Sequence, residues 1–262
     1  MPFTIINPQG KRVPILVSVP HCGTLIPDDI RNTYVEKHLQ CIDDTDWFVD
    51  KLYDFAPQMG ITMLCAKYSR WVIDLNRNHQ GTALYNDGRI ITELTPTKNF
   101  LGENLYRNQV PDDQEIARRL QNYYWPYHKK IRQLLDDLQH EFSEVLFFDA
   151  HSIRRVVPTI RQQPFPDLIL GNQDGKTAKP TLIQTALRVL QDSEYVVQHN
   201  DPFKGGALTR SFGNPSAGVH ALQLEMTKVN YMDDSELHYH HERATKMRKL
   251  LQKMFTALLE EI

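Results

Sequence analysis

Two histidines follow apolar runs, and this placement is the clearest chemical signal in the sequence. His151 follows four consecutive apolar residues, an acid and an alanine in the segment 144–152, and the segment 13–23 delivers His21 to a Gly-containing turn. Short runs rich in Val and Phe are typical of strands buried on both faces of a sheet. Open α/β sheets build their sites at the carboxyl ends of such strands. We therefore predict that the two imidazoles meet and bind a metal ion, although either histidine alone is more often structural.

A cluster of acids could complete this metal site. Asp43, Asp44 and Asp46 stand at the start of a predicted helix. Hydrolytic zinc sites commonly use three ligands drawn from His, Asp and Glu and leave one position for water. We predict one zinc ion bound by His21, Asp46 and His151, with Asp44 as the alternative acid, and the same ligands also suit cobalt, manganese or iron. Helix capping is the other interpretation of the aspartates.

Glu225 is the candidate general base. It stands at the end of the segment 219–225, which alternates larger apolar residues in the manner of a strand. A carboxylate beside a metal ion can take the proton of an activated water and return it to a departing amine. A salt bridge to Lys228 is the alternative role for this acid.

Three arginines indicate what the site binds. Arg70, Arg77 and Arg210 lie in segments that we place at a sheet edge or in a Gly-rich loop. A guanidinium binds a carboxylate through two parallel hydrogen bonds, so several arginines around one metal predict a small acidic substrate. The alternative is structural pairing with acids of the same chain, namely Asp74, Asp149 and Asp201.

The composition excludes several classes of protein. The 262 residues carry a net charge of −2, with acids and bases scattered along the chain, so no basic stripe for nucleic acid is present. No run of about 18 apolar residues and no export signal occurs, which argues against a membrane protein. Three cysteines without Cys-x-x-Cys spacing are typical of a reduced, cytoplasmic protein. We expect a cytoplasmic enzyme that acts on small molecules, as a monomer or a small homo-oligomer.

Predicted strands and helices alternate along nearly the whole chain. No linker, repeat or low-complexity segment divides it, so residues 1–262 are predicted to form a single α/β domain with a helix-covered, largely parallel or mixed sheet. Residues 79–110 have no steady period and are predicted to form a long loop over one edge of the site. Pro126 predicts a kink or a break in a long helix. The predicted strands are 13–19, 60–65, 68–78, 144–152, 167–172, 195–199 and 219–225, and the predicted helices are 27–32, 43–57, 111–142, 177–192 and 234–260.

Seven short motifs occur in the order typical of one enzyme family. They are Pro20–Gly23, Asp44–Trp47, Tyr68–Arg77, Asp149–Ser152, Phe203–Gly206, Thr209–Arg210 and Gly218–Met226. Through these motifs the chain resembles the N-formylglutamate amidohydrolases, also called N-formylglutamate deformylases, over roughly residues 5–255. The resemblance implies a three-layer α/β/α sandwich similar to the zinc carboxypeptidases. It also implies the hydrolysis of N-formyl-L-glutamate to formate and L-glutamate, a step of histidine degradation.

The resemblance also assigns roles to individual residues. His21 and His151 match the metal-binding histidines, and Glu225 matches the acid expected to serve as base. Asn76, Arg77 and Arg210 match positions expected to bind the carboxylates of the substrate.

The sequence departs from the expected pattern at two positions. Thr24 stands where the carboxypeptidases place a metal-binding Glu, so the acidic ligand must come from elsewhere, and Asp46 is our choice. His79 stands where a Pro is expected, which affects the loop on the substrate side. Two other functions stay open: a zinc amidase or deacylase for another N-acyl amino acid or peptide, and a metal-binding module without catalysis.

Overall fold

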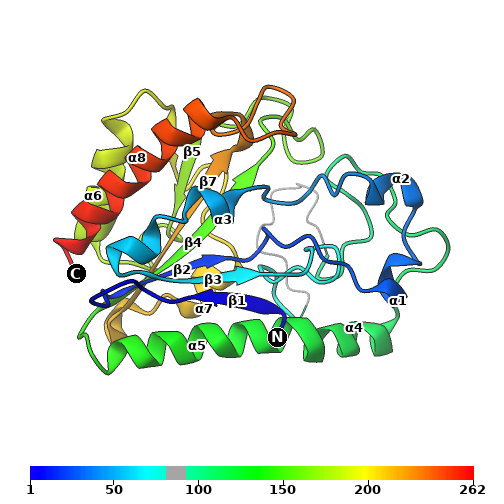
Figure 1. Cartoon of the computed structure of the whole chain (residues 1–262), viewed down its shortest axis with the longest axis horizontal. Coiled ribbons are helices and arrows are strands. Elements are labelled where there is room, and N and C mark those ends of the chain that lie inside the picture. The colour runs from blue at the N-terminus through cyan, green and yellow to red at the C-terminus, as the bar shows by residue number, and fades with distance from the viewer. Residues whose placement is uncertain (81–92) are drawn as a thin grey trace.

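One mixed β-sheet forms the centre of the molecule. In the computed structural model, which describes residues 1–80 and 93–262, seven strands lie in the order β1-β3-β2-β4-β7-β5-β6 (Figure 1). Strands β2, β3, β4 and β7 are parallel to one another, whereas β1, β5 and β6 run the opposite way. The strands are β1 (Phe3–Ile6), β2 (Ile15–Val19), β3 (Thr62–Ala66), β4 (Val145–Ile153), β5 (Leu168–Gly171), β6 (Val197–His199) and β7 (Val219–Thr227).

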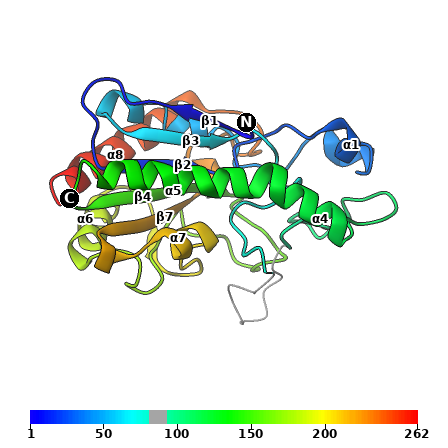
Figure 2. The same ribbon diagram turned by 90° about the horizontal axis from the view of Figure 1, so that it is seen from below.

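Helices cover both faces of this sheet, which makes three layers (Figure 2). Helices α5 and α7 pack on one face, and α3, α6 and α8 pack on the other. Within the ranges 1–80 and 93–262, no helix combines the length and the hydropathy that a membrane crossing requires. The α-helices are α1 (Asp28–Arg31), α2 (Glu36–Leu39), α3 (Val49–Leu52), α4 (Asp113–Arg119), α5 (Trp125–Gln139), α6 (Pro180–Gln191), α7 (Ala207–Phe212) and α8 (His241–Leu259).

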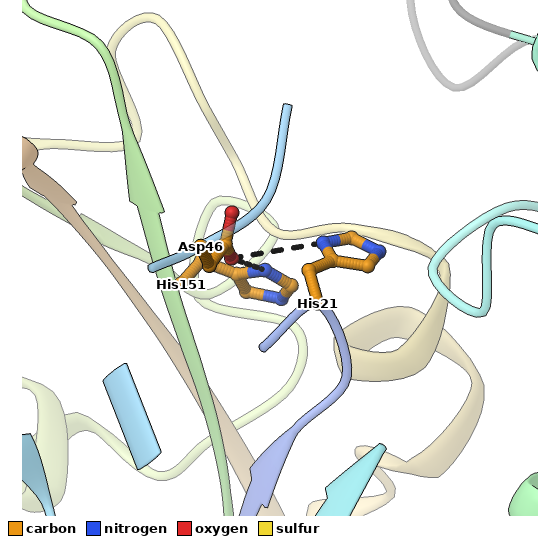
Figure 3. Close-up of side chains that lie close together, drawn as sticks. All are labelled: His21, Asp46 and His151. Atoms are coloured by element: carbon orange, nitrogen blue, oxygen red, sulfur yellow. Dashed lines mark hydrogen bonds and ion pairs between the residues drawn. The ribbon is translucent and has the colours of Figure 1, made fainter. Parts of the chain in front are cut away.

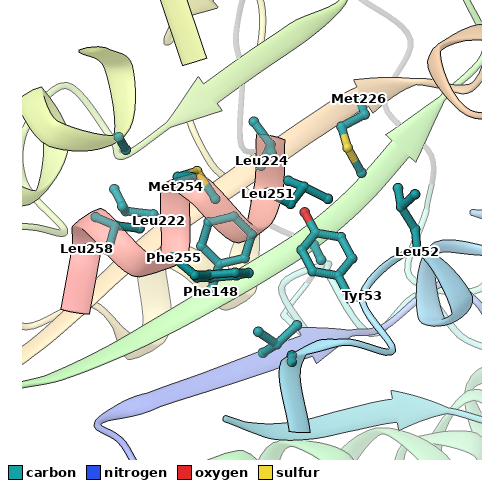
Figure 4. Close-up of a cluster of buried hydrophobic side chains, with 14 of the residues drawn as sticks. Leu52, Tyr53, Phe148, Leu222, Leu224, Met226, Leu251, Met254, Phe255 and Leu258 are labelled. Atoms are coloured by element: carbon teal, nitrogen blue, oxygen red, sulfur yellow. The ribbon is translucent and has the colours of Figure 1, made fainter. Parts of the chain in front are cut away.

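The central strand β4 is buried along its whole length because both of its faces pack against apolar side chains. Leu146 and Phe148 face the layer of α3, α6 and α8, where aromatic and aliphatic side chains fill the space below α8 (Figure 4). Val145 and Phe147 face α5 and α7. This two-residue alternation is that of a pleated strand, and it explains why a continuous apolar run was a correct sign of a buried strand.

Because of the same alternation, polar side chains at the carboxyl ends of the parallel strands lie on the face of the sheet that α5 and α7 cover. In the register of β2, β4 and β7, Asp149 lies between Ser18 and Gln223, and His151 lies opposite Glu225. Neighbouring strands are about 4.8 Å apart, so this register brings the polar groups of three strands together. The predicted placement of a site at this edge is therefore consistent with the fold.

Two predicted elements are wrong, and both lie beside this polar edge. No strand forms at 68–78, because side chains bind the backbone there: the Trp71 N–H donates to Ser69 Oγ and the Asn76 N–H donates to Asp74 Oδ1. Such local bonds compete with strand pairing. The predicted helix 43–57 contracts to α3 and a short 3-10 turn.

The other elements differ mainly in their bounds. The predicted interruption near Pro126 is confirmed: residues 120–124 form a π-helical turn between α4 and α5, because proline has no N–H to donate to the preceding turn. Helix α8 begins at His241, later than predicted, and β1, α2 and α7 were not predicted. Residues 93–110 contain no helix or strand, and residues 81–92 of the predicted loop lie outside the described ranges.

Tyr53 provides a prediction about stability. Its side chain is fully buried in the layer under α8, and its hydroxyl has no hydrogen-bond partner among the described residues (Figure 4). A buried hydroxyl without a partner is desolvated without compensation. We expect Tyr53→Phe to raise the free energy of unfolding by about 1 kcal/mol, measured by urea denaturation. A loss of stability would mean that the hydroxyl is in fact satisfied.

Candidate metal centre

His21, Asp46 and His151 come together at the carboxyl edge of the sheet (Figure 3). His21 lies two residues beyond β2, His151 lies in β4 two residues before its end at Ile153, and Asp46 lies in the loop before α3. One ligand atom from each of them can be chosen so that all lie within 4.8 Å of one another, and all three side chains are buried. The structure thus brings together the three residues that we predicted as ligands.

The distances within this group fit a divalent cation. Asp46 Oδ2 lies 3.2 Å from His151 Nδ1 and 3.7 Å from His21 Nδ1. Two ligand atoms that are each about 2.1 Å from a tetrahedral zinc ion lie about 3.4 Å apart. His21 Nδ1 and Asp46 Oδ1 are buried and have no hydrogen-bond partner among the described residues. An ion between these atoms would satisfy groups that are otherwise desolvated without compensation.

The charges around the group also favour a cation. The pKa of His151 lies well above its ordinary value, because the nearby Asp149 carboxylate outweighs the opposing effect of burial. Asp149 Oδ1 lies 3.1 Å from His151 Nε2. The carboxylates of Asp46 and Asp149 therefore lie on either side of His151 and favour positive charge there.

Asp74 orients the first of the two histidines. Its Oδ1 atom lies 2.8 Å from His21 Nε2, which leaves Nδ1 directed at Asp46. Although burial opposes the charge, Arg70 holds the pKa of Asp74 well below its usual range, so Asp74 is an anion. A carboxylate on the outer nitrogen of a metal-binding histidine fixes its tautomer and raises its basicity. The sequence indicates Asp74 only as a possible partner for arginine, and no pattern separates it from the other acids.

Asn76 lies beside the second histidine. Its Nδ2 atom lies 3.1 Å from His151 Nε2, and its Oδ1 atom accepts a hydrogen bond from the Leu208 N–H at the start of α7. A Cβ atom on Gly206 would come within 2.2 Å of the Asn76 side chain, so only glycine leaves room for it. The Asn76 side chain is thus packed between His151 and the start of α7, and its predicted contact with substrate stays a prediction.

The loop before α3 explains why Asp46, and not Asp44, joins the group. Phe48 adopts a left-handed conformation with φ of 63°, which separates the aspartates from the helix, and no side chain caps the N-terminus of α3. Asp44 turns away to accept hydrogen bonds from Trp71 Nε1 at 2.8 Å and from the Phe100 N–H at 2.9 Å. Helix capping is therefore not the role of these aspartates, and Asp44 is not placed to be the alternative ligand.

Glu225 lies opposite His151 in the register of β4 and β7. Glu225 is the residue of β7 with intermediate exposure, whereas the other residues of this strand are buried. Removal from bulk water nevertheless raises the pKa of Glu225 to about 8. The alternative pairing with Lys228 is wrong, because the Lys228 ammonium group donates instead to the Asp43 carbonyl oxygen at 2.9 Å.

The three arginines have different surroundings. Arg70 is buried, its NH2 group lies 2.6 Å from Asp74 Oδ2, and its guanidinium lies 4.8 Å from the Phe100 ring. Arg77 is only partly buried and lies 3.8 Å from the same Asp74 oxygen. Arg210 is half-buried on α7, where its Nε donates to the Gly205 carbonyl oxygen. The alternative of structural pairing with Asp74 is thus present for both Arg70 and Arg77, and the side chains of Arg77 and Arg210 are partly exposed.

A substitution of Asp74 tests whether residues that orient the histidines contribute to metal binding. Asp74→Asn keeps the shape of the side chain but removes the negative charge beside His21. Because the loss of such a partner commonly weakens metal binding about 10- to 100-fold, we expect that loss in zinc affinity, measured by competition with a chromophoric chelator. Glu144→Gln is the matched control, since Glu144 pairs with the buried His220 at the other end of β7. Equal affinities for all three proteins would contradict the assignment.

Comparisons with known proteins show which family this chain belongs to. The family model described as N-formylglutamate amidohydrolase matches residues 13–232. The chain belongs to the N-formylglutamate amidohydrolase family. It is 37% identical to an N-formylglutamate deformylase of Pseudomonas putida, over 96% of this chain and 94% of that one. It is 38% identical to an N-formylglutamate deformylase of Pseudomonas aeruginosa, over 97% and 96% of the two chains.

Solved structures agree with this membership in the N-formylglutamate amidohydrolase family. The crystal structure of an N-formylglutamate amidohydrolase from Ralstonia eutropha is similar with a TM-score of 0.84 and 27% identity, covering 98% of this chain and 97% of that one. A gene product of Agrobacterium tumefaciens shares the fold with a TM-score of 0.75 and 18% identity, over 98% and 94% of the chains. The predicted family and the predicted three-layer α/β/α class with a mixed, largely parallel sheet are confirmed.

Proposed function

We propose that this member of the N-formylglutamate amidohydrolase family hydrolyses N-formyl-L-glutamate to formate and L-glutamate, as a single catalytic domain. The observation that carries the proposal is the buried group of His21, Asp46 and His151, with the carboxyl group of Glu225 on the adjacent strand. Relatives named N-formylglutamate deformylase, aligned over nearly the full length of the chain, support the choice of substrate.

The same proposal assigns a divalent ion, taken as zinc, to His21, Asp46 and His151. Such an ion, when bound, lowers the pKa of a water molecule and polarises the carbonyl oxygen of an amide. The protein contributes the orientation: Asp74 directs His21 Nδ1 toward Asp46, and the Ser152 N–H donates to Asp46 Oδ2 at 3.2 Å. The ligands would then be held before the substrate arrives, which avoids reorganisation during the reaction.

Glu225 is proposed to move the proton. It takes a proton from water as the oxygen of that water bonds to the formyl carbon, and it gives the proton to the glutamate nitrogen as the C–N bond breaks. A general base works best with a pKa near the operating pH, and the pKa of Glu225 is about 8. A nearby cation favours the charged carboxylate, so the group can act as a base at neutral pH.

The arginines are proposed to bind and to stabilise the substrate. Arg77 and Arg210 reach the surface beside the centre, and each can bind a carboxylate of glutamate through two hydrogen bonds. Arg70 interacts electrostatically with Asp46, so its positive charge lies near the reacting bond and favours negative charge on the formyl oxygen. Holding both carboxylates of the substrate would orient the formyl group for attack.

Formate release from N-formyl-L-glutamate, before and after treatment with a chelator, tests the proposal. We expect rapid release that stops on chelation and returns when zinc is added. N-acetyl-L-glutamate and N-formyl-L-leucine serve as comparisons, because they change the acyl group and the acidic side chain separately. Faster hydrolysis of another N-acyl amino acid would replace the substrate, and zinc binding without hydrolysis would indicate a metal-binding module.

A further inference from the structure

Asp46 is held differently from the two histidines beside it. His151 belongs to β4 and His21 follows β2 by two residues, so the sheet positions both imidazoles. Asp46 instead lies in the segment 43–48, which contains no helix or strand and which we call the aspartate loop. A ligand on a loop is positioned less precisely than one on a strand unless other residues fix it. Side chains from neighbouring segments of the fold must therefore hold the aspartate loop in place.

Tyr231 contacts the aspartate loop directly. Its side chain is fully buried, and its hydroxyl oxygen lies 2.9 Å from the Trp47 carbonyl oxygen and 2.8 Å from Ser152 Oγ. A carbonyl oxygen can only accept a hydrogen bond, so the Tyr231 hydroxyl donates to Trp47. The Ser152 hydroxyl is then left to donate to the Tyr231 oxygen. One phenol thus links the residue that follows Asp46 to the end of β4.

Ser152 closes the connection to the ligand itself. Its backbone N–H donates to Asp46 Oδ2, the same oxygen that lies 3.2 Å from His151 Nδ1. The Tyr231 hydroxyl therefore contacts both neighbours of the carboxylate: the backbone just after Asp46, and the residue whose N–H holds its oxygen. Two hydrogen bonds through one buried hydroxyl leave this part of the aspartate loop few alternative positions.

The other end of the aspartate loop is anchored independently. Lys228 donates to the Asp43 carbonyl oxygen at 2.9 Å, and Arg154 lies 2.7 Å from Asp43 Oδ2. Within the stretch that follows, the Asp44 carboxylate accepts hydrogen bonds from Trp71 Nε1 and the Phe100 N–H. The backbone just after Asp46 is held by the neutral hydroxyl of Tyr231. Replacing a charge here would also change the field at the metal centre, whereas removing the Tyr231 hydroxyl would not. Tyr231 is therefore the residue whose positioning effect can be measured alone.

We propose that Tyr231 is a positioning residue for the metal centre, which acts by holding the aspartate loop so that Asp46 meets His21 and His151. The proposal rests on the function proposed above, in which these three residues bind the metal. Tyr231 is not a catalytic residue, because its hydroxyl is fully occupied by Trp47 and Ser152. Its effect should therefore appear in the affinity for the ion and should depend on Asp46.

The test measures zinc affinity of the full chain by competition with a chromophoric chelator. We expect Tyr231→Phe to weaken zinc binding about 10-fold or more, as is common for residues that support metal ligands. Ser152→Ala, which removes only the other hydroxyl of the link, should weaken it in the same direction. Tyr53→Phe is the matched control, because it makes the same chemical change in the same buried layer at a hydroxyl without a partner, and its affinity should equal that of the wild type.

A double-mutant cycle separates positioning from general destabilisation. If Tyr231 acts through Asp46, Tyr231→Phe should have no further effect on zinc affinity in the Asp46→Ala background. Wild-type affinity in both Tyr231→Phe and Ser152→Ala would overturn the proposal, and so would an equal loss with and without Asp46. Wild-type affinity in Asp46→Ala itself would instead refute the proposed metal centre. The two failures are thus distinguishable by one set of titrations.

Discussion

Replacement of Glu225 by Gln is expected to lower kcat for N-formyl-L-glutamate by about two to four orders of magnitude, the usual contribution of a positioned general base. Gln has the same shape but cannot take up a proton. Glu225 lies opposite His151 without being one of the three clustered side chains, so the variant should keep its zinc. The measurement combines steady-state kinetics with elemental analysis of the purified protein.

The control for this prediction is Glu144→Gln. Glu144 is also a partly exposed acid beside the sheet, but it pairs with Lys179 and His220 at the opposite edge, away from the centre. Its replacement should leave turnover unchanged. Unchanged turnover in Glu225→Gln would remove Glu225 from the mechanism, and a loss of zinc together with turnover would make it a ligand instead of a base.

The strands that carry the histidines could be predicted because their signal is local. A strand buried on both faces must be apolar throughout, and the runs before His21 and His151 satisfy this condition at β2 and β4. The opposition of His151 and Glu225 could not be predicted in the same way. It depends on the register between β4 and β7, which pairs segments that lie far apart in the chain and that no local pattern connects.

The parts of the fold and of the site that the sequence did not predict depend on buried polar contacts. The segment 68–78 looks like a strand because it contains Trp71, Val72 and Ile73, but its conformation follows from Asp74 and Asn76, which bind partners beside the metal centre. A pattern of apolar residues does not indicate which acid forms a hydrogen bond with a histidine. Asp46 lies near His21, as we predicted. The helix predicted for the segment around Asp46 was wrong, because the Asp46 carboxylate forms tertiary contacts with His151 and Ser152.

Replacement of His151 by Ala should abolish tight zinc binding and, with it, hydrolysis. The imidazole is buried between Asp46 and Asp149, and the group among the described residues consists of His21, Asp46 and His151. The loss should exceed the roughly 10- to 100-fold effect of a supporting residue, because a ligand atom itself is removed. Zinc content after dialysis and the rate of formate release measure the two effects.

Thermal unfolding provides an independent measure of the same loss. A ligand that binds only the folded state stabilises it by about 4 kcal/mol at a thousandfold excess over Kd, so zinc should raise the Tm of the wild type and not that of His151→Ala. His220→Asn is the control: His220 is also buried, but it pairs with Glu144 at the amino end of β7, so its loss should lower stability without removing the effect of zinc. A His151→Ala protein that still gained stability from one zinc ion per chain would place that ion elsewhere in the molecule.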